Sequence, residues 1–351
     1  MKLQVSKLVK ATLASLAIVA APSALFADSI DPATFSASLG LGETVTINKT
    51  VTISAGAPTS ALIDVMFLMD TTGSMGSEIA TAKAAASGIL TNLAGFGNLA
   101  SGTAYFSDHP APVAQYTQIT SALNTNAAAT QAGINGFTVG FPSNGGDFPE
   151  EGFYGIQQTT LNTTWRANSN RFIVMFGDAS DGFHASQAQA ASALSNQNVT
   201  LIGVSYSTSF TNQYNATAVA SGGSIANGNS TTGNAASLTA LITSLVTSSF
   251  ANYSSVCLDA SGAPAGVTVT TTGCHVGTYD RSIERTFNFT VAFTGNTVGD
   301  YSFPINALVD GGIVAVESDH IVVADVPEPG MLSLLGLGLL GMGIRRRLIA
   351  A

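Results

Sequence analysis

The feature that most constrains this chain is the near-continuous apolar run Leu62–Met69. An apolar run of this length is typical of a strand that is buried on both faces of a parallel sheet. Directly after it, apolar residues recur at helical spacing, at Ile79, Ala82, Ala86, Leu90 and Leu93. A buried strand that leads into an amphipathic helix is the first unit of an α/β fold.

The same alternation continues to about residue 250. Further strands are predicted at 103–106, 113–119, 171–176 and 199–206, and further helices at 127–134, 150–161 and around 238–245. The sequence therefore predicts an α/β domain over residues 61–250. We expect a doubly wound, mostly parallel sheet with helices on both faces.

Sequence of β type lies on both sides of this block. Residues 28–60 contain two segments rich in β-branched residues and a Gly- and Pro-containing linker. Residues 252–325 alternate in polarity and are punctuated by Gly and Asp, which predicts a small antiparallel β-sandwich. The sandwich either flanks the α/β domain or hosts it, in which case residues 28–60 complete it.

The two ends of the chain have the composition of targeting segments. Residues 1–27 combine early lysines, a short apolar run and the small Ala27, which predicts a secretory signal peptide. The apolar run is shorter than the roughly 20 residues that a membrane span needs. Residues 326–351 contain a second, marginal transmembrane run, which follows Pro327-Glu328-Pro329 and ends at Arg345-Arg346-Arg347.

The charge of the chain limits the classes of partner it can bind, and its cysteines bear on the redox state of the compartment in which it works. Only 9% of residues are charged, and the net charge is −9. Six of the twelve Lys and Arg lie in the two ends, so the body between them is more acidic than the whole chain. The acidic body argues against nucleic acid and anionic membrane surfaces as partners. Export to an oxidising compartment favours a disulfide between Cys257 and Cys274, the alternative being two buried thiols.

The segment from Asp70 to Ser74 carries the clearest chemical signal. It follows the first buried strand directly, and ligands of open α/β sheets bind beyond the carboxyl ends of strands. Asp70, Thr72 and Ser74 alternate and offer hard oxygen donors, which suit Mg²⁺ or Ca²⁺. An alternative is that Asp70 or Thr72 caps the first helix.

Two further acidic positions favour the metal site over the cap. Glu150 lies in the acidic loop Gly145–Glu151, and Asp178 ends the strand predicted at 171–176. Because carboxyl ends of parallel strands meet at one edge, we expect these carboxylates to lie near Asp70.

With these motifs, residues 61–250 resemble a von Willebrand factor A domain, and Asp70-Thr-Thr-Gly-Ser74 resembles its metal-ion-dependent adhesion motif. The Gly-Gly-Asp147-x-Pro-Glu150 run and Asp178 resemble the integrin β type of this domain. The resemblance implies Mg²⁺, or Mn²⁺ or Ca²⁺, held by Asp70, Thr72, Ser74 and Glu150, with Asp178 acting mainly through water. It also implies one coordination position left for a partner's carboxylate.

The integrin β type has two flanking cation sites, for which this chain offers incomplete ligands. Ser77 and Glu78 stand where two acidic residues would hold an adjacent Ca²⁺. A third site would use Asp108, Asp147 and Glu150, although Asp108 also suits a turn before His109-Pro110.

The C-terminal Pro-Glu-Pro, apolar run and Arg cluster together resemble the PEP-CTERM sorting signal of Gram-negative bacteria. The resemblance implies recognition by an exosortase, transient anchoring in the inner membrane, and release or attachment at the cell surface. The alternative is a plain tail anchor.

These features predict an exported adhesion protein that binds an acidic group of a protein or matrix partner. A structural biofilm or surface-layer component with a purely stabilising metal is the alternative. A metal-dependent hydrolase fits less well, because the four histidines lack metal-ligand spacing and Ser74 lacks a nucleophile elbow. The sequence thus predicts a binding protein and no enzyme.

Overall fold

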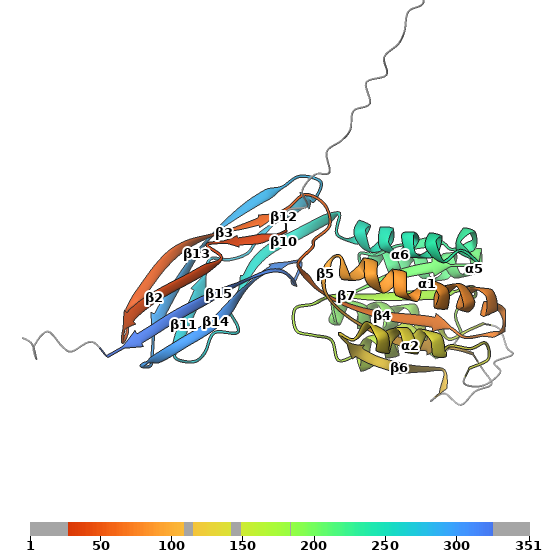
Figure 1. Cartoon of the computed structure of the whole chain (residues 1–351). Coiled ribbons are helices and arrows are strands. Elements are labelled where there is room, and N and C mark those ends of the chain that lie inside the picture. The colour runs from red at the N-terminus through yellow and green to blue at the C-terminus, as the bar shows by residue number, and fades with distance from the viewer. Residues whose placement is uncertain (1–26, 109–114, 142–148, 183, 326–351) are drawn as a thin grey trace, which may run out of the picture.

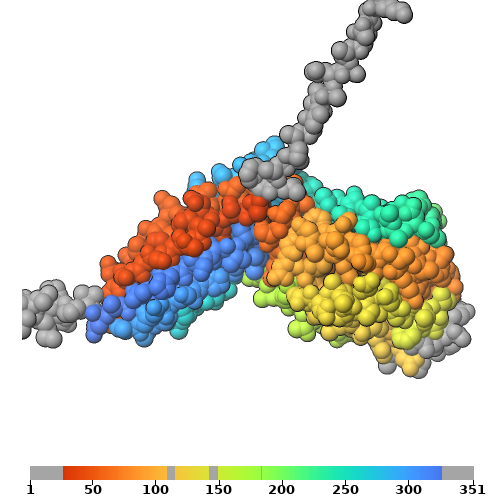
Figure 2. Space-filling view, viewed as in Figure 1, coloured from red at the N-terminus to blue at the C-terminus, as the bar shows by residue number. Residues whose placement is uncertain are grey.

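The computed structural model describes residues 27–108, 115–141, 149–182 and 184–325. These residues form an α/β unit and a β-sandwich that meet end to end (Figure 1). The space-filling view shows that both ends of the described chain, in red and in blue, build the sandwich (Figure 2). The signal peptide and sorting signal predicted from the sequence lie outside the described residues, apart from Ala27.

The α/β unit is built on a six-stranded sheet with the order β6-β5-β4-β7-β8-β9. Its strands are β4 (Ala61–Asp70), β5 (Gly97–Phe106), β6 (Thr117–Asn124), β7 (Asn170–Gly177), β8 (Val199–Ser205) and β9 (Ile225–Asn227). Neighbouring strands run parallel except for β5 and β6, which are antiparallel. The predicted mostly parallel sheet is therefore confirmed.

β4 occupies the interior of this sheet because its side chains can be buried on both faces. Ile63, Val65 and Met66 are completely buried, as expected for a parallel strand covered on both sides. The strand ends at Asp70, which places this carboxylate at the carboxyl edge of the sheet.

Helices cover both faces, as the doubly wound fold requires. One face carries α1 (Gly76–Ala94), α2 (Ala127–Gly136) and α6 (Ala235–Ser249), and the other carries α3 (Gly152–Asn162), α4 (Gln187–Asn196) and α5 (Thr208–Ala220). The apolar periodicity did not reveal α4 and α5, because Ala, Ser, Thr, Asn and Gln dominate them. The N-cap of α4 is Ser186 and that of α5 is Ser207. A serine at this position favours a helix start, so these serines were the sequence feature that could have predicted the two helices.

Two sheets form the sandwich. One has the order β1-β3-β13-β11 and the other β12-β10-β14-β15-β2. The strands are β1 (Ser29–Asp31), β2 (Thr34–Gly40), β3 (Thr44–Ile53), β10 (Asn252–Asp259), β11 (Val267–Thr271), β12 (His275–Asp280), β13 (Arg285–Gly295), β14 (Gly299–Val309) and β15 (Gly312–Ala324). Their pairing is antiparallel, except that β2 runs parallel to β15.

Strands from before and after the α/β unit are direct neighbours in these sheets. β3 pairs with β13, and β2 pairs with β15. Cys257 and Cys274 form a disulfide that joins β10 to the start of β12. The β-rich segments at the two ends of the chain therefore share one core.

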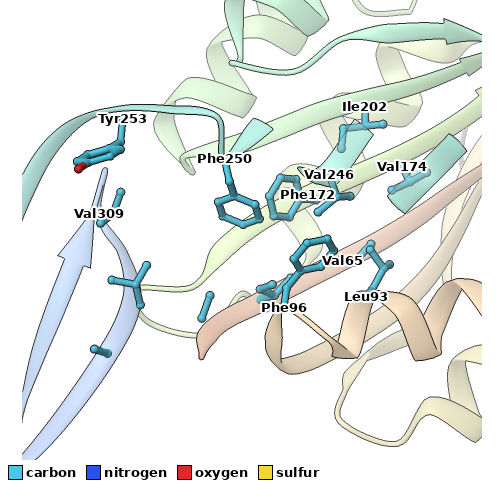
Figure 3. Close-up of a cluster of buried hydrophobic side chains, with 14 of the residues drawn as sticks. Val65, Leu93, Phe96, Phe172, Val174, Ile202, Val246, Phe250, Tyr253 and Val309 are labelled. Carbon is cyan, nitrogen blue, oxygen red and sulfur yellow. The ribbon is translucent and has the colours of Figure 1, made fainter. Parts of the chain in front are cut away.

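Apolar packing continues from the α/β unit into the sandwich. Phe250, at the end of α6, packs against Phe96 and Phe172, with ring centroids 6.0 and 5.6 Å away. Figure 3 shows this cluster leading toward Tyr253 and Val309 of the sandwich. The continuous core holds the carboxyl edge of the α/β sheet away from the sandwich (Figure 1).

Candidate metal centre

Three carboxylates converge at the carboxyl edge of the α/β sheet. Asp70 is the last residue of β4, and Asp178 directly follows the neighbouring strand β7. Glu150 lies two residues before α3. One oxygen from each of the three carboxylates lies within 4.8 Å of the oxygens from the other two. The crossover connections thus bring three separate segments to one point.

Asp70 is fully buried and is oriented by the turn that follows it. Its Oδ1 accepts hydrogen bonds from Thr72 N at 2.9 Å and from Thr72 Oγ1 at 2.6 Å. Its Oδ2 is buried and accepts no hydrogen bond. The alternative of a helix cap is not observed, because α1 follows Met75 without any side-chain cap.

Glu150 is held by backbone pairing with the loop that follows β7. Its N–H donates to Ser180 O at 3.1 Å, and its carbonyl accepts from Gly182 N at 2.5 Å. The neighbouring Glu151 accepts from His184 N at 3.1 Å and has its Oε1 2.7 Å from His184 Nδ1. These contacts fix the backbone that carries Glu150, whose Oε2 is buried and accepts no hydrogen bond.

The strand end beside Asp178 leaves no room for a larger residue. A Cβ at Gly177 would lie 2.6 Å from the Phe210 ring and 3.3 Å from Asp70 Oδ2. A side chain there would therefore displace Phe210 or intrude on the carboxylates. Ser74, on the exposed side of the turn, is close enough to hydrogen-bond the Asp178 side chain.

Burial makes these carboxylates hard to ionise. It raises the pKa of Asp70 to about 7, with a smaller contribution from the charge of Asp178. It raises the pKa of Glu150 to about 8, and the charges of Asp70 and Asp178 add to this. The pKa of Asp178 also rises through burial, while the hydrogen bond from Ser74 partly offsets the rise. Among the described residues, none of the three carboxylates forms an ion pair with Lys, Arg or His.

The donor set fits a small divalent cation. Asp70 Oδ2, Glu150 Oε2 and Asp178 Oδ1 are buried without hydrogen-bond partners, which is costly unless another group satisfies them. Carboxylate and hydroxyl oxygens are hard ligands of the kind that Mg²⁺, Mn²⁺ and Ca²⁺ prefer. A cation among these oxygens would relieve both the unmet hydrogen bonding and the repulsion between like charges.

Of the three residues proposed for flanking sites, Glu78 and Asp108 are described by the structure and do not belong to this carboxylate group. Glu78 is in the first turn of α1 and accepts from Ser77 Oγ at 2.9 Å. Asp108 is buried beyond the end of β5, and its charge contributes to the raised pKa of Glu150. Asp147 lies outside the described residues.

The sequence pattern did not single out two residues that organise this edge. Thr71 Oγ1 donates to Phe141 O at 2.7 Å and to Phe106 O at 3.1 Å, which ties the loop before residue 142 to the site. Asp181 accepts from Phe153 N at 2.6 Å and anchors the start of α3. The spacing of Asp181, three positions after Asp178, was the feature of the sequence that could have pointed to it.

Solved structures that resemble this chain are distant from it in sequence. A von Willebrand factor type A protein from Catenulispora acidiphila is 14% identical, covers 82% of this chain and 71% of its own, and has a TM-score of 0.45. Proximal thread matrix protein 1 from the mussel byssus is 13% identical, with coverages of 58% and 48% and a TM-score of 0.40.

A further structure of that byssus protein, described as having a zinc-occupied MIDAS motif, is 14% identical, with coverages of 46% and 38% and a TM-score of 0.33. An aerotolerance-related membrane protein from Bacteroides fragilis is 13% identical, with coverages of 52% and 98% and a TM-score of 0.40. No curated protein matches the chain in sequence.

Two family models match the sequence itself. The PEP-CTERM protein-sorting motif matches residues 325–347 and implies an exported protein that is processed at its C-terminus. None of the helices in the described ranges is both long and apolar enough to span a membrane. The von Willebrand factor type A domain matches residues 64–243, which is more than half of the chain. The chain therefore belongs to the von Willebrand factor type A domain family and carries a PEP-CTERM sorting motif.

Proposed function

We propose that this exported protein binds a divalent cation at the carboxyl edge of its A domain and uses it to bind an acidic group of a protein or matrix partner. The observation that carries the proposal is the convergence of the buried Asp70 and Glu150 with the half-buried Asp178, without a counter-ion among the described residues. Such a cluster is unfavourable unless positive charge joins it. Mg²⁺ is the expected ion, with Mn²⁺ or Ca²⁺ as alternatives.

Each side chain has a distinct part in this proposal. Asp70 and Glu150 would supply carboxylate oxygens to the ion, with Asp178 acting mainly through water. Thr72 Oγ1 donates to Asp70, so a lone pair of its oxygen remains for the ion. Ser74 is exposed and would contribute its hydroxyl at the rim, where a partner arrives. When bound, the cation supplies the positive charge that attracts a partner's carboxylate.

A binding role explains how an acidic protein can attach to an acidic group. The chain carries a net charge of −9, so its surface by itself would repel an acidic ligand. Catalysis has less support, because His184, which lies near the site, is held by Glu151 and packs on Tyr116. A hydrolase would need a base or nucleophile directed at the metal.

Calorimetric titration of Mg²⁺ into metal-stripped protein tests the metal site. The variant is Asp70→Asn, which keeps the shape and an acceptor for Thr72 but removes the charge. The matched control is Glu284→Gln, which removes a charge from an exposed position of the sandwich. We expect equal heats from wild type and control and none from Asp70→Asn. Equal heats from all three proteins would overturn the proposal.

A pull-down from the surface fraction of the producing organism tests the adhesive role. We expect partners that are retained in Mg²⁺ and released by chelator, and that are lost with Glu150→Gln. If Mg²⁺ binds but no retention depends on it, the metal is purely stabilising, as in a structural biofilm component. Phosphoester or glycan hydrolysis that Asp70→Asn abolishes would show an enzyme instead.

We also propose that both ends of the chain are removed during export. Residues 1–27 would leave as a signal peptide, and an exosortase would act near Pro327-Glu328-Pro329, with Arg345, Arg346 and Arg347 on the cytoplasmic side until cleavage. The mature protein would then reside at the cell surface or in the extracellular matrix of a Gram-negative bacterium. Mass spectrometry of the mature protein tests this, and intact ends would contradict it.

We further propose that residues 61–250 are a domain inserted into one sandwich made from residues 28–60 and 252–325. The pairing of β3 with β13 and of β2 with β15 supports this division. Replacing the inserted residues with a short Gly/Ser linker should leave a folded β protein by circular dichroism. Loss of all ordered structure would count against it.

A further inference from the structure

Lys49 stands at an unusual position in the sandwich. It lies on β3 in phase with Ile47, Val51 and Ile53, so that its side chain points into the core. The residue is completely buried. Lysine is almost never fully buried unless its ammonium group is paired. The sandwich must therefore contain a partner for it.

The partners are two carboxylates on the other sheet. Glu317 and Asp319 both point inward from β15 and are 2% and 0% exposed. Lys49 Nζ lies 3.2 Å from Asp319 Oδ1 and forms a second ion pair with Glu317 Oε1. One amine and two carboxyl groups thus meet between the two sheets.

Aromatic rings enclose this cluster. Phe35 and Phe293 stack with ring centroids 5.2 Å apart, and Lys49 Nζ lies 5.8 Å from each centroid. The rings keep water from the amine. Burying charges in such surroundings is costly, and the proton transfer that makes an ammonium and a carboxylate both neutral lowers that cost.

The two carboxyl groups are both hard to ionise in this environment. Burial raises the pKa of Glu317 to about 7, and the charge of the adjacent Asp319 adds to this effect. Burial also raises the pKa of Asp319, while the Lys49 charge and a hydrogen bond from Glu317 oppose the rise. Glu317 therefore contacts both the amine and the other carboxyl group, which is the position of a proton relay.

We propose that Lys49 and Asp319 condense to an amide that covalently joins the two sheets. Glu317 takes a proton from Lys49 Nζ and passes it to the Asp319 carboxylate, and the lone pair of the neutral nitrogen then attacks Cγ of the protonated Asp319. Glu317 takes a second proton from that nitrogen and delivers it to the departing oxygen as the Cγ–OH bond breaks, which releases water. The overall change is ammonium plus carboxylate to amide plus one water, with no oxidant or co-reactant.

The position of this cross-link gives it a mechanical consequence. It would join residues 270 positions apart, one before and one after the α/β unit. A load applied to the two ends of the mature chain would then pass through the amide and bypass the A domain. Closing so long a loop would also restrict the unfolded chain strongly.

Mass spectrometry of the mature, disulfide-reduced protein tests the proposal directly. We expect a mass lower than the sequence mass by one water, and no tryptic cleavage after Lys49. The peptide that contains Lys49 should be joined to the peptide that begins at Thr286, with fragmentation placing the link at Asp319. The unmodified mass with cleavage after Lys49, a link at Glu317, or a water loss elsewhere would each overturn the proposal.

Two variants separate the chemistry from folding. Glu317→Gln keeps the shape of the relay but cannot carry its proton, so it should show the unmodified mass and normal cleavage after Lys49. Glu284→Gln, on the sandwich surface, should keep the cross-link. Circular dichroism must show both variants folded, and a cross-link of wild-type yield in Glu317→Gln would refute the relay.

Discussion

Replacing Asp70 with Asn should stabilise the metal-free protein. The substitution removes one negative charge from a cluster of three carboxylates, two of them on buried residues, while keeping the acceptor that Thr72 uses. An ordinary substitution at a buried, hydrogen-bonded residue destabilises a protein. The opposite sign is expected here because the native group is held in an environment that disfavours its charge.

The magnitude follows from the pKa of Asp70, which burial raises from 3.8 to about 7. At roughly 1.4 kcal/mol per pKa unit, this corresponds to at most about 4 kcal/mol of lost stability. A raised carboxyl pKa costs nothing below the unfolded pKa, where both states are protonated. The loss in the free energy of unfolding grows as pH rises from about 4 to about 7, and it reaches its full value above pH 7. The metal-free wild type should therefore be more stable at pH 5 than at pH 8.

Urea unfolding at pH 8 measures the effect of the substitution on the metal-free protein and the effect of added Mg²⁺. In chelator, Asp70→Asn should unfold at higher urea than wild type or the control Glu284→Gln. Mg²⁺ at a hundred times its dissociation constant should stabilise wild type and control by about 2.7 kcal/mol and leave Asp70→Asn unchanged. If Asp70→Asn were no more stable than wild type in chelator, the carboxylates would not be strained and the reasoning would fail.

Three further variants test other parts of the structure by urea unfolding, and one of them also by calorimetry. Arg166→Met should cost about 3–5 kcal/mol, because it leaves the fully buried Asp64 without the guanidinium that contacts it at 2.6 Å; a loss below 1 kcal/mol would contradict this. Gly177→Ala should weaken Mg²⁺ binding in calorimetry as well as stability, and unchanged affinity would show that the site tolerates a Cβ. Replacing both Cys257 and Cys274 with Ala should cost about 3 kcal/mol, and no change on reduction of the wild type would refute it.

Much of the α/β fold followed from local pattern. The run Leu62–Met69 predicts a central buried strand, because only a strand covered on both faces tolerates so many apolar side chains in succession. Elements with weak apolar contrast were missed, among them α4 and α5, whose buried faces are largely small or polar. Strand ends were also misplaced, as for β5, which begins at Gly97 rather than residue 103. Local pattern does not report where a neighbouring strand stops pairing.

Part of the candidate metal centre could likewise be predicted from the sequence, and part depends on the tertiary structure. The sequence marks Asp70 as the end of a strand and Thr72 and Ser74 as its neighbours, because these residues are adjacent in the chain. The approach of Glu150 and Asp178 to within 4.8 Å depends on the crossovers that set strand order, so it is a tertiary property. Their burial, which raises the pKa values, comes from helices and loops elsewhere in the chain.

The cluster of Lys49, Glu317 and Asp319 in the sandwich shows most clearly what cannot be predicted from the sequence alone. The alternation of β3 places Lys49 on the same face as Val51, and the alternation of β15 places Glu317 and Asp319 on one face. By itself the sequence determined these phases, since side chains of a strand alternate with a period of two. Only the tertiary structure decided that both faces point into one core and meet, because the facing of two sheets is set by packing across 270 positions of chain.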